Sequence, residues 1–181
     1  MKNSTGLYRL ELIGAAIMVP LGSVMHFAFA WTGYWTPFAL VAAVNESIWE
    51  HLKLAFWPGV MWALLMPLPP HLSRFVVLSA KGISLTITAI LIVMVFTSYM
   101  AILGRNLLVI DIGTFVVAIC VGQIVSAILM ARSRNLGAFI LWPGFAILAL
   151  QLLAYSLLTY FPPDHWLFIE AHSGLRGIPP S

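Results

Sequence analysis

Charged residues are scarce in this chain: Asp, Glu, Lys and Arg together make up 8% of its 181 residues, whereas 61% are hydrophobic. A typical soluble domain carries about 25% charged residues, so the composition excludes an ordinary water-soluble protein. The nine Lys and Arg residues occur singly and form no basic patch of the kind that binds nucleic acid. We therefore expect a polytopic membrane protein whose partner is the lipid bilayer, with no nucleic acid partner.

Cysteine is almost absent as well. The one cysteine, Cys120, lies in the middle of an apolar run. A single cysteine excludes both an intrachain disulfide and a metal cluster held by several thiolates. We expect Cys120 to be a small core residue.

Long apolar runs predict five membrane-crossing helices, because a crossing needs about 20 apolar residues. The expected crossings are Leu12 to Trp31, Ile48 to Pro67, Phe75 to Leu103, Leu107 to about Ala131, and Leu136 to Phe161. The expected fold class is therefore an all-α membrane protein, with a five-helix transmembrane domain at residues 1–161. The remaining residues, 162–181, are expected to form a tail that folds over the polar site described below.

A shorter apolar segment precedes the second crossing. Thr36 and Pro37 are typical of a helix start, with proline at the first helical position. The run that follows, Phe38 to Val44, is too short to cross a bilayer. We therefore expect a short re-entrant or interfacial half-helix from Pro37 to Val44.

The positions of the basic residues predict the orientation, since cytoplasmic loops are enriched in Lys and Arg. With the N-terminus inside, the cytoplasmic side carries Lys2, Arg9, Arg74, Lys81, Arg132 and Arg134, and the outside carries Lys53, Arg105 and Arg176. We therefore expect a multi-pass protein of the bacterial inner (cytoplasmic) membrane, with an extracytoplasmic C-terminus. Most histidines and acids then gather at the outer face, leaving Glu11 inside with Lys81 as its expected partner.

The most polar stretch, Asn45 to Lys53, reads N-E-S-I-W-E-H-L-K and contains two glutamates, a histidine and a lysine. It extends into the second expected crossing. An ionised side chain at mid-membrane costs roughly 2.5–3.5 kcal/mol, so such groups are paired, hydrated or functional. We interpret this stretch as the candidate site.

The same stretch also has a purely structural interpretation. Ser47 and Glu50 have the spacing of a capping box, in which the two side chains bond to the first amides of a helix. Glu50 and Lys53 have the spacing of an ion pair on one helix. The sequence leaves both interpretations open.

Histidines and carboxylates from different helices can hold zinc or another divalent metal, which lowers the pKa of bound water toward about 7. The expected metal ligands are His26 and His51, and the expected catalytic residues are Glu50 and Glu46, as general base or ligand. The expected headgroup-binding residues are Lys53 and Arg105, and the expected outer residues of the site are Asp111, His165 and His172. This chemistry favours a metal-dependent hydrolase or transferase that acts on a lipid-like substrate.

Three alternatives remain. A non-enzymatic transporter or ion-binding protein would also place carboxylates and histidines inside the membrane, but the cytoplasmic half offers few polar residues. A haem bound axially by His26 and His51 has no support beyond the two histidines. The chain could also be an accessory subunit of a membrane complex.

The run V-N-E-S-I-W-E-H-L-K-L-A-F-W-P, from Val44 to Pro58, is preceded by His26 and followed near the end by P-P-D-H-W-L-F and R-G-I. This pattern resembles a family of small bacterial integral membrane proteins of unknown function, and the resemblance covers most of the chain. It implies a membrane location and the importance of these positions, but no reaction. The tail departs from the pattern at Glu170 to His172, where a more acidic stretch would be expected.

Overall fold

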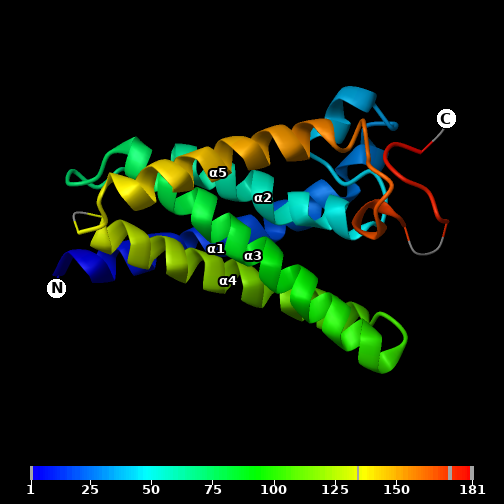
Figure 1. The fold of residues 1–181 in the computed structure, drawn as a ribbon, viewed down its shortest axis with the longest axis horizontal. Helices are drawn as coiled ribbons and strands as arrows, with labels where there is room; N and C mark the ends of the chain where they lie inside the picture. Colours follow the sequence, from blue (N-terminus) through cyan, green and yellow to red (C-terminus); the bar gives the residue numbers. More distant parts are fainter. Residues whose placement is uncertain (1, 134, 171–172, 180–181) are drawn as a thin grey trace.

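The computed structural model describes residues 2–133, 135–170 and 173–179. Five long helices lie side by side (Figure 1). They are α1 (Lys2–Trp31), α2 (Ile48–Leu65), α3 (Arg74–Leu103), α4 (Leu108–Arg132) and α5 (Ala138–Leu157), with two short 3-10 helices, η1 (Thr36–Leu40) and η2 (Trp166–Phe168). The expected all-α class is confirmed, since the described residues contain helices and no strand beyond one isolated bridge.

Among the described residues, four helices are long and apolar enough to cross a membrane: Thr5–Trp31, Arg74–Leu103, Leu108–Arg132 and Phe139–Leu157. The fifth long helix, α2, does not belong to this set, and it carries Glu50, His51 and Lys53 near its start. Length and composition therefore support four of the five expected crossings, and the crossing by α2 stays a prediction.

The segment expected to form a half-helix has a shorter helix than predicted. Its helical part is the 3-10 helix η1, which ends at Leu40, and residues 41–47 are irregular. The amide of Val44 donates to Glu50 Oε2 at 3.1 Å, and the amide of Ser47 donates to Asn45 Oδ1 at 2.9 Å. Because these two amides bond to side chains, they make no helical bonds to backbone carbonyls.

Two helix ends also differ from the expected ones. α1 begins at Lys2, well before Leu12, because the helix continues beyond its apolar part. α5 ends at Leu157 rather than at Phe161. There the amides of Tyr160 and Phe161 both donate to the carbonyl of Leu157 at 3.0 Å, which turns the chain out of the helix.

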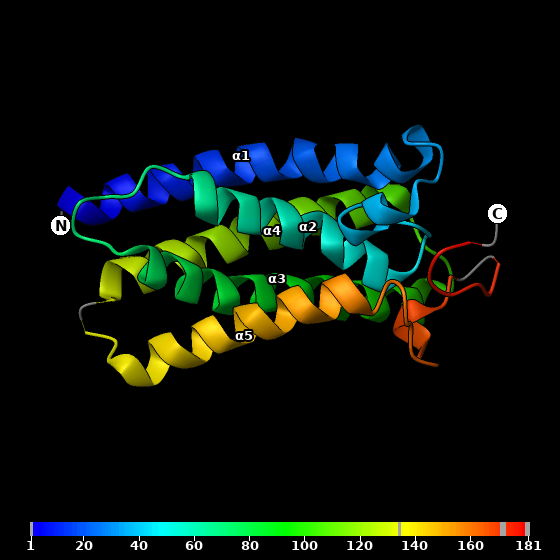
Figure 2. The same cartoon turned by 90° about the horizontal axis from the view of Figure 1, so that it is seen from above.

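Glycine brings α3 and α5 into close contact. A Cβ atom placed on Gly82 would lie 1.9 Å from the carbonyl oxygen of Gly144, so only glycine fits there. Small residues at helix interfaces are the usual means of close packing in lipid, where there is no hydrophobic drive between helices. α3 packs against α2, α4 and α5, while α1 packs against α2 and α4, and Figure 2 shows this arrangement from above.

A buried polar network joins α1, α3 and α4. Lys81 Nζ lies 2.5 Å from Glu11 Oε2 and donates to Gln123 Oε1 at the same distance. Ser126 Oγ donates to Glu11 Oε1 at 3.4 Å, and all four side chains are at most 2% exposed. The expected pairing of Glu11 with Lys81 is therefore confirmed.

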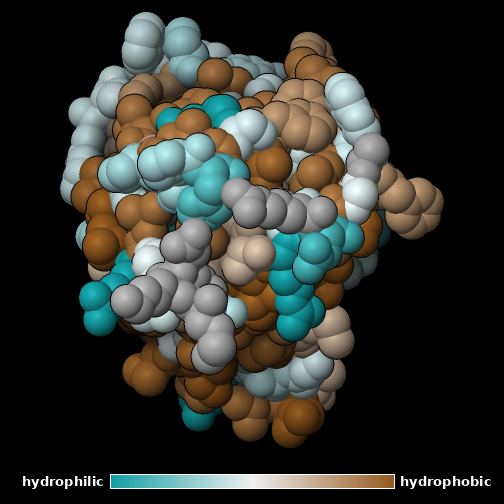
Figure 3. Space-filling model, turned by 90° about the vertical axis from the view of Figure 1, so that its left-hand side faces the viewer, coloured by the Kyte–Doolittle hydropathy of each residue, from teal (hydrophilic) through white to brown (hydrophobic). Residues whose placement is uncertain are grey.

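The two ends of the bundle differ in what they carry. One end holds the N-terminus and the α2–α3 and α4–α5 connections (Figures 1 and 2). Figure 3 looks onto this end, where polar side chains gather in patches among apolar ones. The opposite end holds the long loop between α1 and α2, the α3–α4 turn and the C-terminal tail. The candidate site lies at this second end.

Candidate functional site

Three side chains from separate segments converge at the loop end of the bundle. His26 lies near the end of α1, Glu46 lies in the bend before α2, and His51 lies in the first turns of α2. Glu46 Oε1 is 3.6 Å from His26 Nε2, and Glu46 Oε2 is 3.4 Å from His51 Nε2. One possible ligand atom from each residue lies within 4.8 Å of the other two. We call these three residues the His-Glu cluster.

The backbone before α2 orients His51. Its Nδ1 atom lies 2.8 Å from the carbonyl oxygen of Ser47, one turn earlier in the chain. A carbonyl can only accept, so Nδ1 carries a hydrogen, and Nε2 is the ring nitrogen that faces Glu46. Metal-binding histidines are usually held in this way, with the second ring nitrogen donating to a carbonyl or carboxylate.

The His-Glu cluster is only partly closed off from its surroundings. The side chains of His26, His51 and Glu46 are 24%, 37% and 55% exposed. Nδ1 of His26 is buried and has no hydrogen-bond partner among the described residues. A buried polar atom without a partner costs roughly 1–3 kcal/mol, and functional sites are one of the places where such a cost is found.

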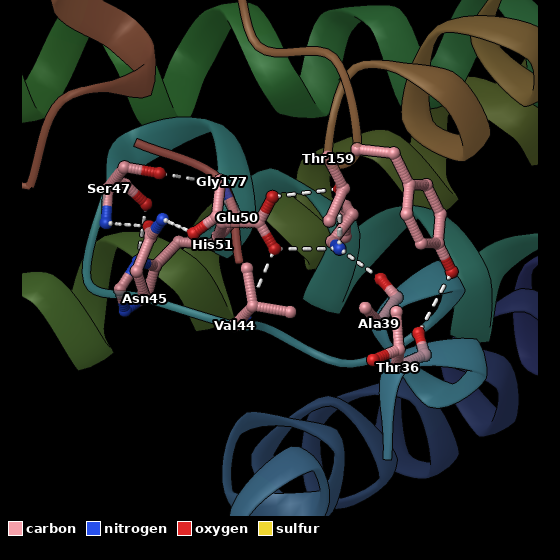
Figure 4. Close-up of polar contacts among 11 residues, drawn as sticks. Thr36, Ala39, Val44, Asn45, Ser47, Glu50, His51, Thr159 and Gly177 are labelled. Carbon is pink, nitrogen blue, oxygen red and sulfur yellow. Dashed lines mark hydrogen bonds and ion pairs between the residues drawn. The ribbon is translucent and has the colours of Figure 1, made fainter. Parts of the chain in front are cut away.

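Glu50 and Lys53 form a second, fully buried group (Figure 4). Lys53 Nζ lies 2.7 Å from Glu50 Oε2 and donates to the carbonyl of Ala39 at 2.8 Å and to Thr159 Oγ1 at 2.9 Å. Thr159 in turn donates to Glu50 Oε1 at 2.8 Å. All three ammonium hydrogens therefore have acceptors. This group, the buried latch, ties η1, α2 and the end of α5 together.

The sequence model of a family of unknown function, DUF6512, matches residues 1–178. The chain belongs to the DUF6512 family. No curated protein and no solved structure matches it. Membership confirms the expected kinship with a family of unknown function, while bacterial origin stays a prediction.

In this DUF6512 chain the predicted site residues of the polar stretch separate into the two groups just described. His51 and Glu46 approach His26, as expected for a shared site. Glu50 and Lys53 do not, because they lie about 100° and 200° around the helix from His51. These two residues share the buried latch instead. Lys53 is 0% exposed, and its ammonium group bonds to Glu50, Ala39 and Thr159. It is therefore not placed to bind a lipid headgroup.

The remaining predicted residues lie elsewhere or have other partners. Asp111, in the first turn of α4, accepts a hydrogen bond from the hydroxyl of Tyr99 on α3, and it also lies near enough to His51 to act on it electrostatically. Arg105 is exposed in the turn between these helices. His165 is exposed in the tail, and its Nδ1 accepts from the amide of Leu167 at 3.4 Å. His172, like Arg134, lies outside the described residues.

The C-terminal tail contributes contacts that the sequence did not predict individually. The Nδ2 atom of Asn45 donates to the carbonyl of Gly177 at 2.8 Å. Phe168 is buried, and its ring stacks on Trp49 with centroids 4.5 Å apart. Thr159 was also missed. Thr159 is one of several hydroxyl residues at the end of an apolar run, so no sequence signal singles it out, and its partner Glu50 lies more than 100 residues away.

Proposed function

We propose that this DUF6512 member is an integral membrane protein that binds one divalent metal ion of the zinc type through His26, Glu46 and His51. The observation that carries this proposal is the convergence of two imidazole nitrogens and a carboxylate from three segments. A tetrahedral ion with bonds of about 2.0–2.1 Å holds its ligand atoms roughly 3.3 Å apart. Glu46 lies 3.6 Å from His26 and 3.4 Å from His51 through different carboxylate oxygens, and one ligand atom from each of the three residues lies within 4.8 Å of the other two. Small side-chain rotations would bring these atoms to the tetrahedral spacing.

The ligand set favours a catalytic metal over a structural one. Structural zinc sites are closed by four protein ligands, whereas catalytic sites use three and leave a position for water or substrate. Zinc held by two histidines and a glutamate lowers the pKa of bound water toward about 7 and so supplies hydroxide at neutral pH. The function that follows is metal-dependent hydrolysis or group transfer on a lipid-like substrate. Glu46 acts here as a ligand, and Glu50 belongs to the buried latch.

The site opens at the extracytoplasmic face if the chain crosses the membrane five times with its N-terminus inside. Four apolar helices support four crossings. α2 can complete the fifth because its charged side chains face protein. Glu50 and Lys53 are buried and paired, so α2 does not need the apolar surface that lipid contact demands.

Transport is less well supported than metal chemistry. A second polar group, the Glu11–Lys81 network, lies in the other half of the bundle. Between it and the His-Glu cluster lies an apolar core that includes Ala15, Met18 and Ile119, each at most 4% exposed. A path for ions would need polar groups along this stretch.

The metal content of purified protein tests the proposal. Wild type, His26→Ala and His51→Ala would be equilibrated with zinc, desalted and analysed by mass spectrometry, with His71→Ala as the control because His71 is exposed in the α2–α3 connection. We expect about one zinc ion per chain in wild type and control, and loss of that zinc in the other two variants. Folded wild type without zinc, or equal zinc in all four proteins, would contradict the proposal.

A further inference from the structure

Exposed aromatic side chains surround the end of α1 beside the His-Glu cluster. The ring of Phe27 contacts that of His26 edge-on at 4.7 Å and stacks on Trp31 at 5.9 Å. Phe27 and Trp31 are 53% and 69% exposed, and Tyr34 and Trp35 in the following turn are 65% and 59% exposed. Trp and Tyr at the end of a membrane span lie at the level of the lipid headgroups. His26 lies five residues before Trp31 on α1, about 7.5 Å below that level.

The charge of the proposed metal site indicates what kind of ligand it takes. A divalent ion with two neutral imidazoles and one carboxylate keeps a net charge of about +1 and an open position. Both features favour an anionic oxygen ligand. At the border between the headgroups and the acyl chains, the phosphodiester of a phospholipid presents such an oxygen next to apolar carbons.

We infer that the metal held by His26, Glu46 and His51 binds the phosphodiester of a phospholipid, with Phe27 and Trp31 against the apolar part of the same molecule. This inference rests on the proposed metal site and narrows its substrate class from lipid-like molecules to phospholipids. The polar and the apolar part of the phospholipid would each contact a surface of matching character. The phosphate would bind the metal ion, and the glycerol and acyl carbons would pack against the exposed rings of Phe27 and Trp31.

Cobalt-loaded protein in phosphate-free detergent gives a direct test, because the visible absorption of Co²⁺ reports a change of ligand. Three probes would be titrated: dihexanoyl phosphatidylglycerol, dihexanoyl glycerol as the matched lipid without phosphate, and inorganic phosphate. We expect a saturable spectral change with phosphatidylglycerol and none with dihexanoyl glycerol. Inorganic phosphate should need a concentration about tenfold higher or more, a difference of about 1.4 kcal/mol.

Substitutions separate the aromatic contribution from metal binding. Trp31→Ala should weaken phosphatidylglycerol binding about three- to tenfold, in line with the loss of about one aromatic contact. Trp31 stacks on Phe27 rather than on His26, so cobalt affinity should stay unchanged. The control is Phe139→Ala, since Phe139 is 89% exposed at the start of α5, at the opposite end of the bundle.

The possible outcomes separate a failure of the phospholipid inference from a failure of the proposed metal site. A cobalt spectrum that is lost in His51→Ala but insensitive to phosphatidylglycerol would overturn the phospholipid inference and leave the metal site in place. Inorganic phosphate that binds as tightly as the lipid would also overturn it, because the ligand would then be free phosphate. A cobalt signal that survives unchanged in His51→Ala would overturn the proposed metal site.

Discussion

The carboxylates of Glu46 and Glu50 are four residues apart in the sequence and meet different partners. Glu46 lies 3.6 and 3.4 Å from the Nε2 atoms of His26 and His51, whereas Glu50 is buried 2.7 Å from Lys53 Nζ. Glu46 precedes the first residue of α2 and Glu50 follows it, so the two residues do not share a helix face. One polar stretch therefore builds both the His-Glu cluster and the buried latch.

This division predicts opposite effects for two equivalent substitutions. Glu46→Gln should weaken zinc binding by tenfold or more, because an anionic ligand is lost, and should leave thermal stability in detergent nearly unchanged. Glu50→Gln should leave zinc binding intact and lower the free energy of unfolding by roughly 3–5 kcal/mol, because Lys53 stays buried without its counter-ion. Zinc titration and thermal unfolding of both variants check this. The same loss of zinc in both would contradict the division.

The Glu11–Lys81 pair should behave as a structural unit. Lys81→Met leaves Glu11 buried without its cation and should lower the free energy of unfolding by roughly 3–5 kcal/mol. The double variant Glu11→Gln with Lys81→Met removes both charges and should recover at least half of that loss. Unfolding in detergent measures both. A double variant less stable than Lys81→Met alone would show that the pairing is not what stabilises this part of the bundle.

The close packing of α3 against α5 can be tested with a glycine substitution on α3 and a matched control substitution on α4. Gly82→Ala would place a Cβ atom 1.9 Å from the carbonyl oxygen of Gly144 and should cost about 1–3 kcal/mol through displacement of α3 from α5. Gly113→Ala, where no atom lies within 4 Å of the added carbon, should be neutral or stabilising by up to about 1 kcal/mol. Comparable melting temperatures for the two variants would argue against the close contact of α3 and α5.

Accessibility labelling tests the five crossings and their orientation. In a Cys120→Ser background, Arg105→Cys and Arg176→Cys should react in intact cells with a thiol reagent that does not cross membranes. Arg132→Cys should react only after the membrane is opened. If α2 does not cross, Arg105 and Arg132 still lie on opposite sides of α4, but Arg105 would then share a side with the N-terminus. Labelling of Arg105→Cys and of a tag at the N-terminus from the same side of the membrane would therefore contradict the five-crossing topology.

The helices could be predicted from sequence because each apolar run is long enough to need a helix in lipid. Glu11 could be paired with Lys81 because Glu11 was the one acid expected in that half of the bundle and Lys81 lies inside an expected crossing. The latch partner Thr159 could not be found, because it requires knowing that the end of α5 lies beside the start of α2. The same contact helps to explain why α5 ends at Leu157, since Thr159 lies in the turn that follows it.

X-ray absorption at the zinc K-edge of the zinc-loaded protein tests the metal site most directly. We predict a first shell of nitrogen and oxygen at about 2.0–2.1 Å, with the outer-shell scattering of two imidazole rings. That imidazole scattering should disappear in the double variant His26→Ala with His51→Ala. A first shell of oxygen alone, without imidazole scattering, or a spectrum that the double substitution does not change, would contradict a zinc site built from His26, Glu46 and His51.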